Sequence, residues 1–139
     1  MNATLTKLDL GENYIGSQGA TGFAEALKVN STLTVLYLYS SGIHDQGATG
    51  LAEALKVNST LTKLYLCRNM IDAQGATDLA EALKMNKTLT VFNLCGNNIG
   101  ETVLSELLCL EHDSRIIMLP SQSSYDEDWF SFLYDNINL

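Results

Sequence analysis

A repeat of 28 residues constrains the fold of this chain more than any other feature. Asparagine recurs at that spacing, and a similar string follows it each time, at Asn2, Asn30, Asn58 and Asn86. Residues 30–57 and 58–85 agree at 19 of 28 positions without a gap. A repeat this short cannot bury its apolar face alone, so neighbouring copies must stack. The sequence therefore predicts a solenoid of four 28-residue repeats over residues 2–113.

Each repeat carries two apolar periods. In the third repeat, Leu64 and Leu66 alternate with other residues, as in a strand with one face turned inward. Ala76, Leu79 and Leu83 then fall on one face of a helix. Because a helix returns the chain each time, successive strands must be parallel and the crossovers right-handed. The strands are expected within residues 5–10, 33–38, 61–66 and 89–94.

The repeated pattern L-x-x-L-x-L-x-x-N-x-I, followed by glycine and by L-A-x-A-L, resembles leucine-rich repeats of the ribonuclease-inhibitor-like subfamily. The third repeat has it at Leu61, Leu64, Leu66, Asn69, Ile71, Gly75, Leu79, Ala80, Ala82 and Leu83. The string GATGLAEALKVNSTLTKLYL is similar to the repeats of NOD-like receptors. The resemblance implies an α/β solenoid in a short right-handed horseshoe arc. Parallel strands lie about 4.8 Å apart and packed helices about 8–10 Å apart, which places strands on the concave face and helices on the convex face.

The 139 residues are expected to form a single leucine-rich repeat domain with two different ends. Residues 114–119 predict a degenerate fifth strand, which Pro120 stops. Beyond it, aromatic and aliphatic residues predict a helix that caps the C-terminal end, at Trp129, Phe132, Leu133 and Ile137. The alternative is that this tail is an exposed acidic-aromatic linear motif. The first repeat has no such cap, so we expect partial protection by residues 1–4 or weak self-association.

Residues that recur at the same repeat position are expected to serve the scaffold. An amide side chain recurs at Asn13, Asn69 and Asn97 and is predicted to bond the turn and the next repeat. Gly19, Gly47 and Gly75 predict a close approach or an unusual φ where the chain enters the helix. The four N-x-[ST] asparagines are interpreted as left-handed helix caps rather than glycosylation sites.

Function is expected where the repeats differ. The centre of the concave face is predicted to be one exposed patch that binds a partner protein, formed by Tyr37, Tyr39, Tyr65, Lys63 and Arg68. Tyrosine and arginine are enriched at binding hot spots. The alternative is that neighbouring rings pack on each other, stabilise the sheet and bind nothing.

The sequence offers little to a catalytic interpretation. Cys67 and Cys95 should lie side by side at the same position of adjacent repeats. They are interpreted as a redox pair, as half of a metal site or as small structural residues. His44 and His112 lie elsewhere in their repeats, and His44 with Asp45 is interpreted as a solvated pair. We therefore expect no enzyme activity, no cofactor and no metal.

Composition narrows the class of partner. A formal net charge of −8 argues against nucleic acid, and it would either steer a basic protein partner or simply aid solubility. No apolar run approaches the roughly 18 residues of a membrane span. Three cysteines without a secretory signal predict a reduced, cytoplasmic protein. The preferred function is a non-catalytic protein-protein interaction module. The alternative is a regulator of enzyme activity resembling ribonuclease inhibitor or Ran GTPase-activating protein.

Overall fold

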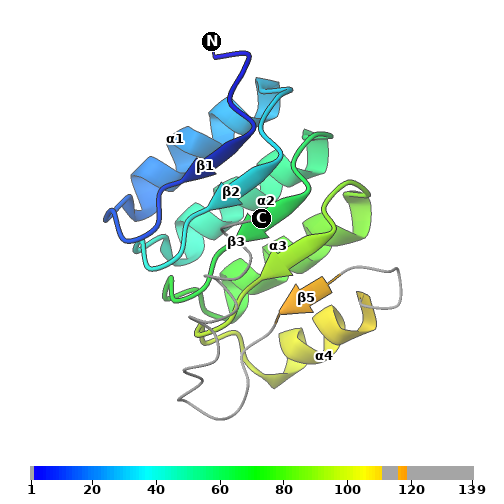
Figure 1. Cartoon of the computed structure of the whole chain (residues 1–139). Helices are drawn as coiled ribbons and strands as arrows, with labels where there is room; N and C mark the ends of the chain where they lie inside the picture. Colours follow the sequence, from blue (N-terminus) through cyan, green and yellow to red (C-terminus); the bar gives the residue numbers. More distant parts are fainter. Residues whose placement is uncertain (1, 111–115, 119–139) are drawn as a thin grey trace.

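The computed structural model describes residues 2–110 and 116–118. Strands and helices alternate along this part of the chain, in the order β1 (Lys7–Asp9), α1 (Gly16–Val29), β2 (Val35–Tyr37), α2 (His44–Val57), β3 (Lys63–Tyr65), α3 (Ala73–Met85), β4 (Val91–Asn93), α4 (Glu101–Cys109) and β5 (Ile116–Met118). The strands form one layer and the helices lie in a second layer against it (Figure 1). The strand layer is called the inner face below.

The five strands form one parallel sheet in chain order. Residues one repeat apart lie side by side, as Leu36 does with Leu64 and Leu64 with Phe92. Each of the four predicted ranges contains an observed strand, so the parallel strand-helix solenoid is confirmed. β5 lies within residues 114–119 and pairs with β4. The predicted aromatic cap at Trp129, Phe132, Leu133 and Ile137 lies outside the described residues and stays a prediction.

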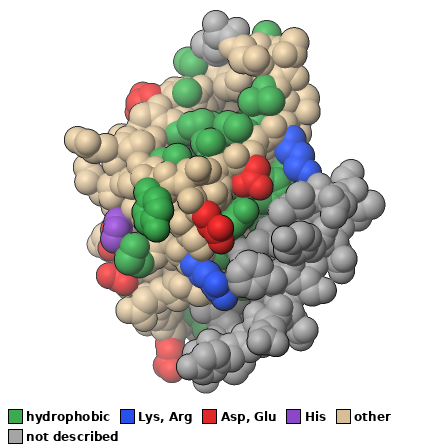
Figure 2. Space-filling view, turned by 60° about the vertical axis from the view of Figure 1, so that its left-hand side comes forward, with side chains coloured by type: hydrophobic (Ala, Val, Ile, Leu, Met, Phe, Trp, Pro, Cys, Tyr) green, Lys and Arg blue, Asp and Glu red, His purple; other side chains and the backbone are tan. Residues whose placement is uncertain are grey.

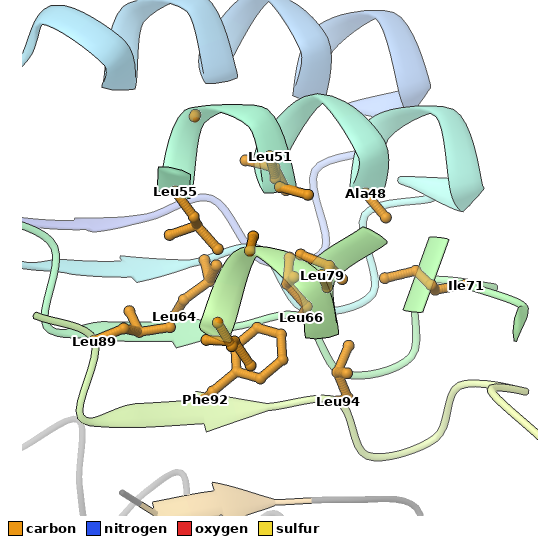
Figure 3. Packing of buried hydrophobic residues seen from close by; sticks show 14 of the residues in the cluster. Ala48, Leu51, Leu55, Leu64, Leu66, Ile71, Leu79, Leu89, Phe92 and Leu94 are labelled. Carbon is orange, nitrogen blue, oxygen red and sulfur yellow. The ribbon is translucent and has the colours of Figure 1, made fainter. Parts of the chain in front are cut away.

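The core fills the space between the two layers. Strand residues such as Leu64 and Phe92 point toward Leu51, Leu55 and Leu79 of the helices (Figure 3). These side chains are buried. Apolar residues therefore alternate along the strand of each repeat and recur with the helical period along its helix. Burial of this surface is the main stabilising contribution to the solenoid.

A second set of contacts joins the repeats through buried asparagines, and here the sequence prediction was wrong in direction. The side chain of Asn69 bonds its own turn and the preceding repeat, and the next repeat bonds only its backbone, through Oδ1 of Asn97. Its Nδ2 donates to the carbonyl of Leu38 at 2.7 Å, and its Oδ1 accepts from the N–H of Ser41 at 2.9 Å. Asn97 repeats this arrangement with the carbonyl of Leu66. The reason is geometric. The amide side chain reaches the turn of the preceding repeat, where the N–H of Ser41 and the carbonyl of Leu38 have no partner in the sheet.

The N-x-[ST] asparagines are also not left-handed. The φ angles of Asn30, Asn58 and Asn86 are −78°, −73° and −74°, in the extended region. The Oδ1 of Asn58 accepts from the N–H groups of the two residues at the start of the next turn, and its Nδ2 donates to the carbonyl of Leu27. A side chain that closes its own turn and bonds the preceding repeat needs no left-handed backbone.

Close approach, rather than unusual φ, explains the recurring glycines. A Cβ on Gly75 would lie 2.6 Å from Oδ1 of Asp45 and 3.0 Å from Cβ of Ala48. The same oxygen of Asp45 accepts from the N–H groups of Gly75 and Asp72. Asp45 is therefore not a solvated neighbour of His44, as predicted, but a cap that repeat two supplies to helix α3 of repeat three.

Candidate functional site

The candidate site lies on the inner face, where the strands of repeats two and three run side by side. Tyr37 and Tyr65 are in register on adjacent strands, and their rings stack with centroids 4.6 Å apart at 11°. Each is 1% exposed, so the prediction that both are exposed was wrong. They form a small buried cluster with Cys67 and Val91. Parallel strands in 28-residue register place identical rings face to face, and each ring covers the other.

The electrostatics of the two rings follow from this burial. Burial raises the pKa of Tyr65 to about 12, and the neighbouring Tyr37 and Cys67 add to the shift. The pKa of Tyr37 is also raised, first by burial and then by the negative charge of Asp9. The ammonium of Lys7 lies 5.5 Å from the ring centroid of Tyr37, within cation–π range. Both phenols are therefore neutral throughout the physiological pH range.

The other three predicted residues reach the surface around this stacked pair. Tyr39 and Lys63 are half-buried, and Arg68 is exposed. Arg68 has a left-handed backbone with φ of 54°, and its N–H donates to the carbonyl of Cys95 at 2.9 Å. This bond fixes the backbone from which the Arg68 side chain leaves the inner face. The structure thus places all five predicted residues in one region but divides them into a buried pair and three surface residues.

Two glycines shape this region, and reasoning from the sequence missed them. The ring of Tyr39 lies against Gly11, where an added Cβ would overlap the ring atoms Cε1 and Cζ. The stem of Arg68 lies against Gly96, where a Cβ would be 2.8 Å from its Cγ. Gly11 and Gly96 each lie one 28-residue repeat from the side chain that they accommodate. The signal was therefore present, as a large residue in one repeat and a glycine at the same position in a neighbouring repeat.

The thiols near the site differ in exposure. Cys67 is buried, Cys95 is half-buried and Cys109 is exposed, and all three are free. Burial raises the pKa of the Cys67 thiol, and the neighbouring Cys95 adds to this effect. Within residues 2–110 and 116–118, no group of three or more His, Cys, Asp or Glu side chains is arranged to hold a metal ion. The redox interpretation of the Cys67–Cys95 pair stays untested.

Comparison with known proteins shows which fold this geometry resembles. Residues 2–24 and 29–52 match the family model described as Leucine Rich repeat. The fold is that of a leucine-rich repeat solenoid. Its fold resembles the structure of Leiomodin-1 Actin-Binding Site 2 (TM-score 0.75, 23% identity, covering 99% of this chain and 83% of that chain). It also resembles a tropomodulin C-terminal domain from structural genomics of Caenorhabditis elegans (TM-score 0.75, 13% identity, covering 99% and 89%). A search of curated protein sequences gives no significant match.

Charge is distributed differently on the two layers of the solenoid. Each of three helices carries a lysine paired with the glutamate three residues before it, as Lys28 is with Glu25 at 2.7 Å. Lys63 and Arg68 instead lie on the strand side, beside the stacked tyrosines. In the view of Figure 2, acidic and basic side chains are interspersed with apolar ones. No helix in the described part of the chain is both long enough and apolar enough to span a bilayer.

Proposed function

We propose that this protein is a non-catalytic protein-protein interaction module that binds its partner through the inner face. One observation carries the proposal. Tyr39, Lys63 and Arg68 are not shared with the neighbouring repeats, yet adjacent repeats bring them to one region of the surface. Scaffold positions recur every 28 residues, whereas these positions change from repeat to repeat. Positions that the repeat pattern does not fix are the ones whose side chains can be specific to a partner.

The proposal gives the five residues two roles. Tyr39, Lys63 and Arg68 contact the partner directly, through an aromatic edge and two cations. Tyr37 and Tyr65 form a rigid base beneath them, because the stacked rings are buried and fixed by the strand register. Rigid support of this kind lowers the conformational entropy lost on binding.

The chemical nature of the partner is proposed from charge and from the structural likeness. The net charge of −8 favours a partner with a basic surface. The similar leiomodin structure is an actin-binding site, so actin is the first defined protein to test. The 28-residue period supports placing the repeats in the ribonuclease-inhibitor-like subfamily, with NOD-like receptor repeats as relatives. The free thiols suit a reducing compartment, and we propose a cytoplasmic location.

The experiment that tests this function is affinity capture from a reduced cell extract with matched variants. A triple variant, Tyr39→Ala, Lys63→Ala and Arg68→Ala, removes the three surface contacts and leaves the stacked pair in place. Lys28→Ala is the control, because it removes one cation from helix α1 on the opposite layer. The proposal expects one protein to be enriched by the parent and by the control but lost with the triple variant. Equal recovery of that protein by all three would contradict the inner-face site.

Purified actin provides a second, defined measurement. Co-sedimentation with filaments and binding of monomers by isothermal titration calorimetry separate the two forms of actin. Binding that the triple variant weakens, and that Lys28→Ala leaves unchanged, would identify actin as a partner of the inner face. Absence of binding to either form removes actin as the partner. A captured protein that proves to be an enzyme whose activity changes on binding would favour the regulator alternative.

A further inference from the structure

The N-terminal end of the solenoid exposes apolar positions that every later repeat buries. Leu5 is 42% exposed, whereas the residues at the same position, Leu33, Leu61 and Leu89, are 4%, 0% and 1% exposed. Residues 2–4 form a turn at this end, in which Oδ1 of Asn2 accepts from the N–H groups of Thr4 and Leu5. Leu5 stays partly exposed beside this turn. Partial protection by residues 1–4, the first of the two sequence-based alternatives, stays a prediction, because residue 1 lies outside the described residues.

Helix α1 at this end has the surface that α2 and α3 use for packing. A Cβ on Gly47 of α2 would lie 2.9 Å from Cβ of Ala20, and one on Gly50 would lie 3.4 Å from Thr21. The same positions in α1 are Gly19 and Gly22, both exposed, and a Cβ on Gly22 would meet nothing within 4 Å. The outward side of α1 thus continues the established interface between repeats by one more step, with no helix against it in the described part of the chain.

Strand β1 ends the sheet on the same side. Thr6 and Leu10 direct backbone groups to repeat two: the carbonyl of Thr6 accepts from the N–H of Thr34, and the N–H of Leu10 donates to the carbonyl of Tyr37. Because backbone groups alternate in direction along a strand, those of Lys7 and Asp9 face the outer edge. The edge that another strand would meet therefore carries one basic and one acidic residue on either side of Leu8.

We propose that a second copy of this chain covers this end, by antiparallel pairing of β1 with the second copy's β1. Two copies of the same sheet edge can join into one sheet only by a two-fold rotation, which makes the strands antiparallel. If the axis passes at Leu8, Lys7 lies opposite the second copy's Asp9, and Asp9 opposite the second copy's Lys7. Both side chains are exposed, so the edge is complementary to itself in charge.

The same rotation brings the two copies of α1 together through their outward sides. The glycines at positions 19 and 22 let the helices approach, as the equivalent glycine does between α1 and α2. The dimer joins the two sheets edge to edge, with both inner faces on the same side. Neither Lys63 nor Arg68 takes part in it, whereas Lys7 adjoins the inner-face site as well, because its ammonium lies 5.5 Å from the ring centroid of Tyr37.

Charge-swap variants in analytical ultracentrifugation test this dimer. Lys7→Asp alone and Asp9→Lys alone each place like charges opposite one another twice, and each should weaken the dimer about tenfold or more. An equimolar mixture of these two single variants should form a heterodimer, because opposite charges then face each other at both pairs. The double variant carrying both changes should dimerise as the parent does. Lys28→Asp, which makes the same charge change on the helix layer, should leave the dimer intact.

A further variant guards against loss of folding as an explanation. Gly22→Gln adds a side chain into open space and favours the helix, so the monomer should keep its circular dichroism spectrum and melt at or above the temperature of the parent. The dimer should be lost, because that side chain occupies the place of the second α1. A parent that stays monomeric at every concentration would overturn the proposal and leave this end to a different partner. Failure of the mixed single variants to associate would overturn the antiparallel register.

Discussion

The asparagine ladder between the repeats allows a graded prediction at Asn69. In Asn69→Ala, three buried groups of the preceding repeat lose their partner. The N–H of Ser41 and the carbonyl of Leu38 make short bonds to Asn69, and the N–H of Ile43 makes a longer bond of 3.4 Å. The carbonyls of Leu66 and Cys67, which also accept from Asn69, keep a second donor in Asn97 and in the N–H of Ser40. A buried group left unsatisfied costs about 1–3 kcal/mol, so loss of the two short bonds in Asn69→Ala should lower the free energy of unfolding by about 2–6 kcal/mol.

The chain itself contains the matched comparison. Repeat two has Ser41 at this position, and its Oγ donates to the carbonyl of Leu10 at 3.1 Å. Asn69→Ser should therefore keep the bond to Leu38 and lose the acceptor for the N–H groups of Ser41 and Ile43, of which the Ser41 bond is the short one, at about 1–3 kcal/mol. Asn98→Ala removes an exposed amide whose side-chain contact with Asp72 is 3.5 Å long, and it should change stability by less than about 0.5 kcal/mol.

Urea unfolding followed by circular dichroism measures these differences, with the slope of the transition checked for each variant. The expected order of stability is parent and Asn98→Ala together, then Asn69→Ser, then Asn69→Ala. If Asn69→Ala were as stable as the parent, the amide ladder would not hold the repeats together. If the serine and alanine variants were equally destabilised, the assignment of separate donor and acceptor roles would be wrong.

Three further predictions concern packing, ionisation and thiol reactivity. Gly75→Ala should melt at a lower temperature than the parent, because its Cβ would meet Asp45 and Ala48. Gly22→Ala should instead be stabilised by about 1 kcal/mol, because its Cβ meets nothing and alanine favours the helix. The opposite order of melting temperatures would refute the packing argument. The Tyr65 pKa of about 12 lies above its ordinary value of 10.0. The contribution of the neutral Tyr65 phenol to stability is therefore complete below pH 10.0 and is lost as the pH rises toward 12. Absorbance of tyrosinate should show this late ionisation of Tyr65 in the parent and not in Tyr65→Phe. In the native protein a disulfide reagent should modify Cys109 quickly and Cys67 only after unfolding, and equal rates would contradict the burial of Cys67.

The repeat made the scaffold predictable from the sequence. The 28-residue period placed each strand, because Leu64 and its equivalents are buried for the same reason in every copy. A period also implies that whatever one copy does, its neighbours do in register. Fold class, strand order and parallel pairing all follow from that implication and from the need of a helix to return the chain.

Details that depend on which neighbour a side chain reaches were not predictable in this way. A period is the same in both directions along the solenoid, so it does not tell whether Asn69 bonds the preceding or the next repeat. The burial of Tyr37 and Tyr65 depends on their contacts with each other and with Cys67 and Val91, which a pattern of alternation does not contain. Asp45 has Ser17 and Ala73 in its place in the two neighbouring repeats, so its capping role gave no periodic signal there.

The central claim, that the inner face binds a partner protein, is tested most directly by site-specific photocrosslinking in a cell extract. A photoreactive amino acid replaces Arg68 on the inner face in one variant and Lys28 on helix α1 in another, so that each reports contacts within its own reach. We expect a discrete adduct with one protein from the Arg68 position and no adduct with that protein from the Lys28 position. An adduct formed from the Lys28 position alone would contradict the claim, because the partner would then bind the helix layer.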